Sequence, residues 1–382
     1  ATVIGVWVAA FPMERMLRGD DHAIGATAGP AWRRGEYLDF NIRHHVLVVA
    51  VPMTIILFAS NICDGYEREL VAWLRVPWAP EMLLGIVACG VFLIAPLLLC
   101  RIWRTVPLND GPVRTRLEAV CRRIGLRCRG ILVWKSDGMV INAAVMGVAA
   151  PVRYVLLSDG LLETMSEPQI EAVFAHEAGH IRHRHLQHFL VFALVGWLFV
   201  AGFTELIARG FGAVDGAPGL SFVTIQGVGV VVTAIVWGVG FGWVSRRFER
   251  QADVFGARCV APDAAACHMP CSVHIDDDTT LDGSGRLCAT GAAIFASALD
   301  RVATLNAIPH DERSWRHSSI GSRMRFLTNL ANDPQRAAQF DRLVRTIKRT
   351  LVIAAMVGCA ATALYWEVLG TPVLVRMQLT GP

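Results

Sequence analysis

Five long apolar stretches constrain the fold of this chain more than any other feature of its sequence. They cover residues 46–63, 82–103, 189–208, 222–244 and 351–369. An α-helix needs about 20 mostly apolar residues to cross a bilayer, and each stretch meets or approaches that length. Charged residues make up only 18% of the chain, against about a quarter in a typical soluble domain. The sequence therefore predicts an integral membrane protein with five spans in a lipid bilayer.

The spans divide the rest of the chain into an N-terminal loop and two larger polar blocks. Strand-like runs occur at GILVWKSD, MVINAAVMG and RYVLLS, and most of the remaining polar sequence has helical periodicity. The sequence therefore predicts a mainly α, multi-span fold with a few strands in the first block. We expect five parts in order: loop and first two spans (1–103), first polar block (104–187), transmembrane hairpin (188–244), second polar block (245–348), and last span with its tail (349–382).

The distribution of arginine predicts the orientation of the spans. Cytoplasmic loops of membrane proteins are enriched in Lys and Arg. The N-terminal loop and the starts of both polar blocks are rich in Arg, whereas the loop 64–81 holds only Arg68 and Arg75, and residues 210–221 hold none. Both polar blocks are therefore expected on the cytoplasmic side.

Residues 172–185, AVFAHEAGHIRHRH, contain a His-Glu-x-x-His sequence. His176 and His180 are four residues apart, so on a helix they project from one face and two imidazole nitrogens can bind one Zn²⁺. Glu177 is rotated off that face, where a carboxylate can act as the general base for hydrolysis. Gly179 lowers helix propensity by up to about 1 kcal/mol against Ala, which predicts that close packing or access to the site requires a glycine there. The pattern favours a zinc site over a surface helix with spare histidines.

The third metal ligand must come from another segment, and SRRFERQADVFGA (245–257) offers a candidate pair. Glu249 and Asp253 are four residues apart and share a helix face. One carboxylate can bind zinc while the other accepts an N–H from a ligating imidazole. The alternative is a solvated acidic pair that bridges to neighbouring arginines. Spacing alone leaves both interpretations open.

The chain resembles the integral-membrane zinc endopeptidases that include the HtpX heat-shock proteases and the CAAX prenyl proteases. Four segments carry the resemblance: NAAVMG, RYVLLSDGLLETMSEPQIEAVFAHEAGHIRHRH, SRRFERQADVFGA and RHSSIGSRMRFL. The similarity runs in order through about residues 105–330. It implies that His176, His180 and Glu249 bind one catalytic Zn²⁺, with Glu177 as base and Asp253 as a supporting carboxylate. It also implies a zincin-like metalloprotease domain of helices plus a small β-sheet, built from the two polar blocks.

The same resemblance implies roles for four further residues. Asn142 and Ala143 match an edge strand that pairs with the substrate backbone; the alternative is an ordinary strand followed by a turn at Gly147. His317 would donate to the tetrahedral oxyanion, and Arg323 would pair with a carboxylate near the zinc. This sequence has His-Ser-Ser where the family has His-Pro.

The remaining histidines and most cysteines are expected to have structural roles rather than roles in the metal site. His185 follows His180 by five residues, which on a continuous helix turns it about 500° and off the ligand face, so we expect a structural or interfacial role. The segment CHMPCSVH contains Cys267, His268, Cys271 and His274, which suit a second zinc, a disulfide or merely an inserted loop. The scattered cysteines elsewhere are expected to be reduced thiols.

The function predicted is that of a membrane-bound zinc metalloendopeptidase acting on membrane or membrane-associated proteins, without a nucleic-acid partner. The resemblance favours a bacterial inner membrane and a quality-control role over prenyl-protein processing. One alternative is an intramembrane site-2-type protease, although Glu167, Glu171, Arg182 and Arg184 make the motif helix polar for a bilayer centre. The other is a catalytically silent zinc-binding scaffold.

Overall fold

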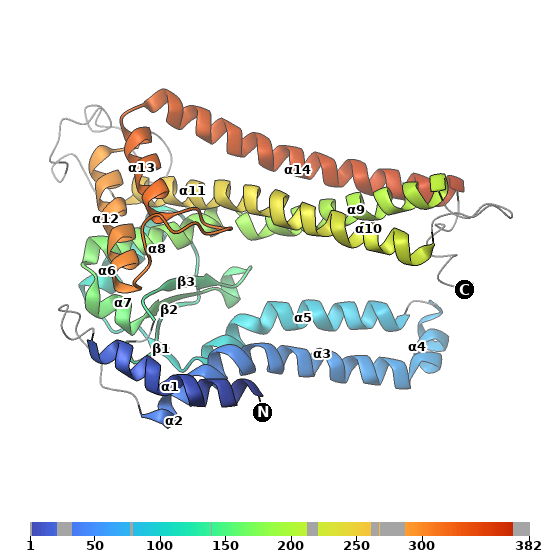
Figure 1. The fold of residues 1–382 in the computed structure, drawn as a ribbon, viewed down its shortest axis with the longest axis horizontal. Coiled ribbons are helices and arrows are strands. Elements are labelled where there is room, and N and C mark those ends of the chain that lie inside the picture. Colours follow the sequence, from blue (N-terminus) through green and yellow to red (C-terminus); the bar gives the residue numbers. More distant parts are fainter. Residues whose placement is uncertain are drawn as a thin grey trace. The chain divides into compact units, whose positions relative to one another are not determined.

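The computed structural model of the protein describes residues 2–20, 33–76, 79–138, 140–211, 221–260, 267 and 287–369. The chain forms two compact units. The first comprises Ala1–Glu177 with Ser297–Ile308, and the second Ala178–Ala296 with Pro309–Pro382. Helix α8 (Glu167–Arg182) is one continuous helix that begins in the first unit and ends in the second (Figure 1).

The first unit contains a helical hairpin and a sheet with short covering helices. Its elements in chain order are α1 (Thr2–Asp20), α2 (Arg34–Asn41), the π-helical turn η2 (Ile42–Leu47), α3 (Val48–Gly65), α4 (Glu67–Leu74), α5 (Ala79–Ile102), β1 (Thr105–Pro107), α6 (Pro112–Arg123), β2 (Gly130–Trp134), β3 (Ala143–Met146), the 3-10 turn η3 (Ala150–Val152), β4 (Tyr154–Ser158) and α7 (Asp159–Thr164).

The second unit contains helices and no strand among its described residues. After the end of α8 it contains α9 (His185–Phe211), α10 (Phe222–Ile235), the π-helical turn η4 (Val236–Phe241), α11 (Gly242–Cys259), α12 (Ala289–Leu305), α13 (Ile320–Ala331) and α14 (Pro334–Leu369). The last residues of α12 belong to the first unit. Helices α9, α10 and α14 lie side by side, with α9 in contact with both of the others (Figure 1).

Five helices in the described part of the chain are long and apolar enough to cross a membrane, which confirms the five predicted spans. They cover Arg34–Gly65, Ala79–Ile102, His185–Phe211, Phe222–Cys259 and Pro334–Tyr365. Their apolar side chains are widely exposed: Phe58 is 67% exposed and Val230 is 68% exposed. A hydrocarbon environment removes the free-energy cost of that exposure. The protein is therefore a membrane protein of mainly helical fold.

The first unit also contains the small sheet that the sequence predicts. Its strands follow the order β1-β2-β4-β3, in which β2 and β4 are parallel and the two outer strands are antiparallel to their neighbours. The central strand β4 is the most buried, with Val155, Leu156 and Leu157 fully buried. Strand β3 lies at an edge, so one side of its backbone has no strand partner among the described residues.

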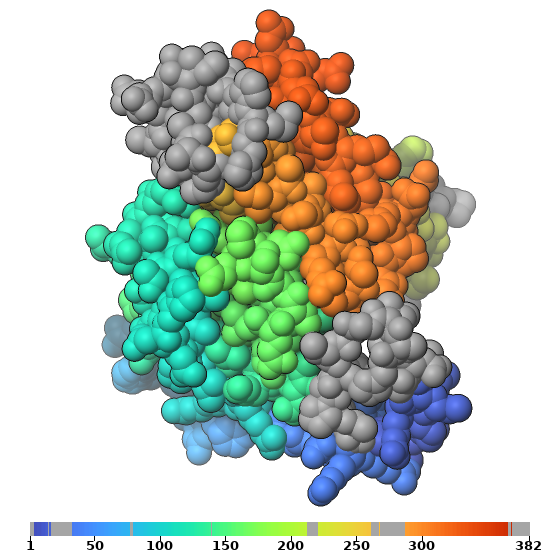
Figure 2. Space-filling view, turned by 90° about the vertical axis from the view of Figure 1, so that its left-hand side faces the viewer, coloured from blue at the N-terminus to red at the C-terminus, as the bar shows by residue number. Residues whose placement is uncertain are grey.

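Helix α6 packs beside the start of α8 through both apolar and charged contacts. Leu117 and Val120 of α6 are each 1% exposed. The carboxylate of Glu171 accepts from Arg116 at 3.1 Å and from Arg123 at 3.3 Å. In Figure 2 the teal segment that includes α6 and the green segment that includes α7 and the start of α8 lie against each other. The pairing holds the beginning of the motif helix to the first unit.

Candidate metal centre

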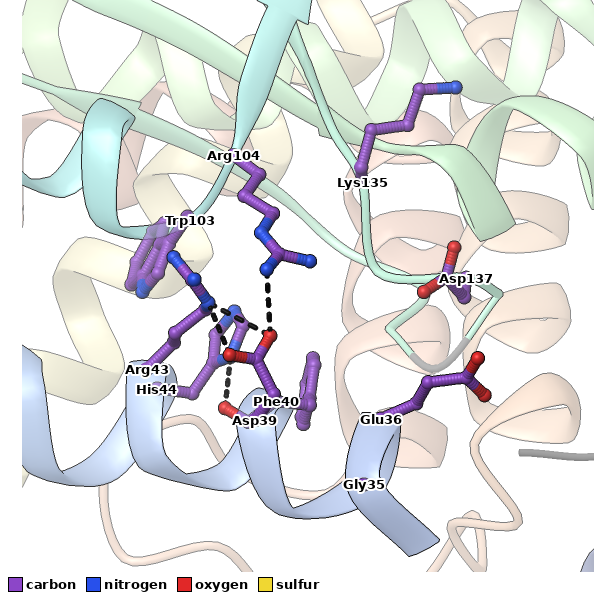
Figure 3. A pocket seen from close by; sticks show the side chains of 10 residues that line it. All are labelled: Gly35, Glu36, Asp39, Phe40, Arg43, His44, Trp103, Arg104, Lys135 and Asp137. Atoms are coloured by element: carbon purple, nitrogen blue, oxygen red, sulfur yellow. Dashed lines mark hydrogen bonds and ion pairs between the residues drawn. The ribbon is translucent and has the colours of Figure 1, made fainter. Parts of the chain in front are cut away.

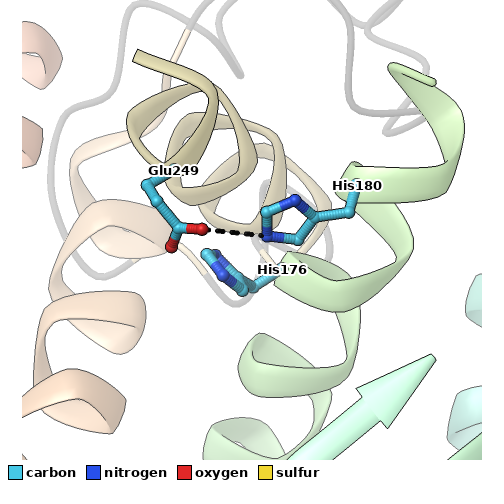
Figure 4. A group of neighbouring side chains, drawn as sticks. All are labelled: His176, His180 and Glu249. Atoms are coloured by element: carbon cyan, nitrogen blue, oxygen red, sulfur yellow. Dashed lines mark ion pairs between the residues drawn. The ribbon is translucent and has the colours of Figure 1, made fainter. Parts of the chain in front are cut away.

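Helix α8 presents the two motif histidines one turn apart, as the sequence predicts. It begins at Glu167 and continues through His176 and His180 without interruption. One ring nitrogen of His176, one ring nitrogen of His180 and one carboxylate oxygen of Glu249 lie within 4.8 Å of one another (Figure 4). This brings together the three residues for which the sequence proposes metal ligation.

A close helix contact brings Glu249 to α8. A Cβ added at Gly179 would lie 3.1 Å from the ring Cδ1 of Phe255 and 3.3 Å from the Cα of Ala252. Both distances are shorter than ordinary van der Waals contact, so a larger residue at Gly179 would separate the helices. The packing reason that the sequence predicts for Gly179 is confirmed.

The carboxylate of Glu249 is buried among imidazoles. Its side chain is 8% exposed; Oε1 lies 3.7 Å from Nε2 of His180, and Oε2 lies 2.9 Å from Nδ1 of His317. A buried carboxylate is costly unless cations or donors surround it. Two imidazole nitrogens and one carboxylate oxygen match the donor types that bind zinc. The residues present therefore fit a divalent metal of that class.

Asp253, one turn further along α11, is paired with Arg323 of α13. The guanidinium donates from Nε to Oδ2 at 2.9 Å and from Nη2 to Oδ1 at 2.5 Å. Asp253 is fully buried and Arg323 is 8% exposed. The structure thus places Arg323 against the carboxylate one turn from Glu249, and the family resemblance implies such a pairing near the metal. A bidentate, buried pair of this kind fixes α13 against α11.

The loop before α13 holds His317 near Glu249. Trp315 donates its indole N–H to the carbonyl oxygen of Gly238 at 2.6 Å. The backbone carbonyl of Trp315 accepts from Arg246 at 2.8 Å. These contacts hold both sides of Trp315 to one helix, and His317 follows two residues later.

Asn142 and Ala143 lie at the start of the edge strand β3 in the first unit. The N–H of Asn142 donates to Oγ of Ser158 at 3.0 Å, and its side-chain oxygen accepts from the N–H of Ala143 at 2.9 Å. The strand is followed by Gly147, which has φ 97° and where a Cβ would lie 2.3 Å from the carbonyl oxygen of Val152. The chain therefore forms an open-edged strand and also the glycine turn of the alternative interpretation.

His185 differs from the sequence-based expectation. Helix α8 ends at Arg182, and Arg184 adopts a left-handed conformation with φ 54° before α9 begins. His185 Nδ1 consequently lies 2.9 Å from His180 Nδ1. The expectation assumed a continuous helix, and the break between α8 and α9 makes that premise wrong. Nearby, burial and the positive charges of Lys348 and Arg182 lower the pKa of His183 to about 3, so its ring is neutral.

The cysteine-rich segment is only partly within the described residues. Cys267 Sγ lies 3.6 Å from Cys288 Sγ and 3.1 Å from Oγ1 of Thr290. His268, Cys271 and His274 fall outside the described residues. The described cysteines are free thiols, in agreement with the expectation of reduced cysteines.

Known proteins resemble this chain across its polar blocks. A family model described as Peptidase family M48 matches residues 107–310. The CAAX prenyl protease 1 homolog of Arabidopsis thaliana is 29% identical over 193 residues, covering 47% of this chain and 44% of that protein. Protease HtpX of Acinetobacter baylyi is 33% identical over 129 residues, covering 32% of this chain and 43% of that protein. The chain thus spans less than half the length of these two relatives.

Two further proteins extend the comparison. The Protease HtpX homolog of Aeropyrum pernix is 25% identical over 266 residues, covering 63% of this chain and 82% of that protein. The crystal structure of S. mikatae Ste24p has a TM-score of 0.49 and 18% identity, and the match covers 77% of this chain and 66% of that one. The family match includes His176, His180 and Glu249 and ends before His317 and Arg323.

Proposed function

The chain belongs to peptidase family M48, and from this premise we propose that it is a membrane-bound zinc endopeptidase acting on membrane or membrane-associated proteins. The observation that carries the proposal is the convergence of His176, His180 and Glu249, whose ligand atoms lie within 4.8 Å of one another. Catalytic zinc sites use three protein ligands of these types and keep a position for water or substrate. One zinc ion is therefore the proposed cofactor.

Glu177 is the proposed general base. When bound, zinc would polarise the scissile carbonyl and make an attacking water more acidic. Glu177 follows His176 directly, so its carboxylate is turned about 100° around the helix from that ligand. It accepts the proton that the water releases as the new C–O bond forms. It then gives that proton to the amide nitrogen as the C–N bond breaks, which leaves a carboxylic acid and an amine.

The residues around this centre have supporting roles in the proposal. His317 lies 2.9 Å from Glu249 and is 45% exposed at its side chain, so it can reach an incoming peptide. We assign it the N–H that stabilises the developing oxyanion. The buried pair of Asp253 and Arg323 holds α11, and therefore Glu249, in a fixed position.

The edge strand β3 is the proposed binding element for the substrate backbone. Its outer side has no strand partner among the described residues. An extended peptide can add to such an edge through main-chain hydrogen bonds that do not depend on side-chain identity. Ala143 begins this strand and Asn142 directly precedes it; these two are the proposed substrate-binding residues.

The proposed location is a bacterial inner membrane with the site facing the cytoplasm, because arginine is concentrated in the two polar blocks. Helix α8 is not one of the five membrane-crossing candidates among the described residues. That observation favours a site beside the membrane over a site-2-type intramembrane protease. A catalytically silent zinc scaffold is the alternative that an activity assay must separate.

The test compares Glu177→Gln with the unchanged protein in membranes, using casein and a membrane-protein substrate. We expect the variant to keep its zinc and to lose chelator-sensitive cleavage. Glu163→Gln, an exposed glutamate of α7, is the matched control and should keep full activity. Full cleavage by Glu177→Gln would refute the mechanism. Zinc in the unchanged protein without any chelator-sensitive cleavage would favour the scaffold.

A further inference from the structure

A chain of hydrogen bonds runs away from the proposed ligand His180 to a half-buried lysine. His180 Nδ1 lies 2.9 Å from His185 Nδ1, and His185 Nε2 lies 3.0 Å from Oε1 of Gln251. The same amide oxygen accepts from Nζ of Lys348 at 2.7 Å. These residues come from α8, α9, α11 and α14, all within the second unit.

The break between α8 and α9 makes this arrangement possible. Five residues of uninterrupted helix would turn His185 about 140° away from His180. The left-handed conformation of Arg184 instead redirects the chain. His185 is 1% exposed, and its ring stacks on Phe248 with centroids 4.6 Å apart and planes 8° apart. The ring therefore has one fixed orientation.

The donors and acceptors of the chain determine where each proton lies. The Lys348 ammonium can only donate, so the group that it meets on Gln251 is the amide oxygen. That oxygen accepts from His185 as well, which puts a hydrogen on His185 Nε2. In a neutral ring the other nitrogen, Nδ1, is then an acceptor. The hydrogen between the two rings must belong to His180 Nδ1, and His180 Nε2 keeps its lone pair.

His180 Nε2 is the nitrogen that faces Glu249, at 3.7 Å from Oε1. We propose that His185, Gln251 and Lys348 are positioning residues that hold His180 in the tautomer whose Nε2 binds the metal. The inference rests on the proposed function, because it concerns the tautomer of His180 as a ligand of that same metal centre. Ligating histidines usually donate their second nitrogen to a carboxylate, carbonyl or water; here a second histidine accepts, and an amide and an ammonium fix its own tautomer.

The test measures zinc affinity by competition with a chromophoric chelator, on full-length protein in detergent. Gln251→Leu removes the acceptor and should weaken zinc binding by about 10- to 100-fold, the usual effect of losing an outer hydrogen-bond partner. Gln251→Glu keeps an acceptor for both His185 and Lys348 and should keep the affinity. Lys348→Met should weaken zinc binding in the same direction, whereas Arg349→Met, one exposed residue further along α14, should not.

The outcomes separate this inference from the proposed function. If the unchanged protein binds no zinc, the proposed function fails. If the unchanged protein binds zinc and Gln251→Leu binds it equally tightly, only the positioning role is overturned. Equal losses in Gln251→Leu and Gln251→Glu would show that packing matters and the acceptor does not, which also overturns it. Should Gln251→Leu not fold, Lys348→Met and its Arg349→Met control decide the question.

A second site lies in the first unit, where a pocket of about 220 Å³ opens at one end of the α3–α5 hairpin. Its charged groups are separated (Figure 3). On one side, Arg43 and Arg104 surround Asp39, with nitrogen–oxygen distances of 2.9 and 3.2 Å. On the other side lie the carboxylates of Glu36 and Asp137, with the Lys135 ammonium on the same side as Asp137. One side of the pocket thus has two arginines with one aspartate, and the other has two carboxylates with one lysine.

A stack of aromatic rings forms one wall of this pocket. His44 and Trp103 line the pocket, and each also stacks on Trp134 behind them; the ring centroids are 5.6 Å apart for His44 and Trp103, 5.0 Å for His44 and Trp134, and 4.7 Å for Trp103 and Trp134. Both indole N–H groups are buried, and the described residues offer them no hydrogen-bond partner. Buried donors of this kind usually have a partner.

The length of the first span implies that the pocket lies at the level of lipid headgroups. The first span covers 32 residues, Arg34–Gly65, whereas about 20 residues cross the hydrocarbon. Its polar beginning, which contains Glu36, Asp39 and Arg43, therefore extends beyond the hydrocarbon. Tryptophan is enriched at that depth, and basic pockets between membrane helices bind the phosphate-bearing headgroups of lipids.

We infer that this pocket binds the headgroup of a zwitterionic phospholipid that carries a primary ammonium. The phosphate would accept from Arg43 and Arg104, and the ammonium would donate to Glu36 and Asp137. The test is native mass spectrometry of the full-length protein with added phosphatidylethanolamine or phosphatidylglycerol. We expect retention of phosphatidylethanolamine and about tenfold weaker retention in the double variant Glu36→Gln with Asp137→Asn. Glu81→Gln, at the opposite end of α5, is the control and should retain the lipid. Equal retention of both lipids, or no effect of the double variant, would overturn the assignment.

Discussion

Removing Arg323 tests how the site is held together. Its guanidinium donates two hydrogen bonds to Asp253, which is fully buried, while Arg323 itself is 8% exposed. Truncating one partner of a buried pair leaves the other charge uncompensated and costs about 3–5 kcal/mol. We therefore expect Arg323→Leu to lower the free energy of unfolding by about that amount, since each 1.4 kcal/mol corresponds to a factor of ten in the folded-to-unfolded ratio.

A control two residues away on the same helix makes this prediction specific. Arg325 lies 3.9 Å from Asp311, and the two side chains are 70% and 89% exposed. Exposed pairs contribute about 0–1 kcal/mol, so Arg325→Leu should be nearly neutral. Both variants would be unfolded by titration with a denaturing detergent in mixed micelles, followed by circular dichroism. Similar losses of unfolding free energy in the two variants would refute the reasoning, because burial of the ion pair would then not determine how much stability is lost.

A second substitution tests whether the loss comes from the unpaired carboxylate. Asp253→Asn in the Arg323→Leu background removes the charge that the first change leaves buried. Replacing both partners of a buried pair is commonly far less costly than removing one. The double variant should therefore recover part of the lost stability. A double variant less stable than Arg323→Leu would show that Asp253 contributes through another contact.

Three further predictions concern other parts of the chain. Gly179→Ala should destabilise the protein despite the higher helix propensity of Ala, because the added Cβ would lie 3.1 Å from Phe255. In the control Gly202→Ala, the added Cβ has nothing within 4 Å, so this change should be neutral or stabilising. The midpoints of thermal unfolding of the two variants test this difference. A hydrogen bond from Cys121, with a contribution from the positive charge of Arg153, lowers the pKa of Cys128 to about 7, so its alkylation rate should rise with pH and reach half its maximum near pH 7. Cys121→Ala should move that midpoint to higher pH, and an unchanged midpoint would contradict the assigned cause. Trp315→Phe loses the 2.6 Å bond to Gly238 and should lower the cleavage rate while zinc content stays constant, as measured by metal analysis; unchanged cleavage would show that the loop holds His317 without this bond.

Features that depend on neighbouring residues could be predicted from the sequence. Span number follows from the length of apolar runs, and the shared face of His176 and His180 follows from helical spacing. The close helix contact at Gly179 could also be anticipated, because a glycine within a predicted helix lowers its stability and is usually retained for packing or access. The helix of the fourth span continues to Cys259, since Arg and Glu are strong helix formers that extend a helix into water.

Features that depend on distant residues could not be derived from spacing. Nothing in the periodicity pairs Asp253 with Arg323, seventy residues away; only the family resemblance suggested such a partner. His185 was placed off the ligand face on the premise of a continuous helix, and no Gly or Pro between Arg182 and His185 marks the end of α8. The break instead uses Arg184 in a left-handed conformation, which costs about 1 kcal/mol or more and is rarely signalled by residue type. The contacts of Gln251 and Lys348 followed from that break and were missed with it.

The π-helical turn η4 connects the fourth span to the position of His317. A π turn widens the helix, so some carbonyl oxygens lose their usual α-helical partners. The carbonyl of Gly238 lies in η4 and accepts from Trp315. Gly242 leaves room for that indole, since a Cβ there would lie 2.5 Å from the Trp315 nitrogen. One irregular turn thus supplies the acceptor for Trp315, and α11, which begins at the end of that turn, carries Glu249. His317 and Glu249 therefore meet at 2.9 Å because both are held to the same helix, one through its loop and the other directly.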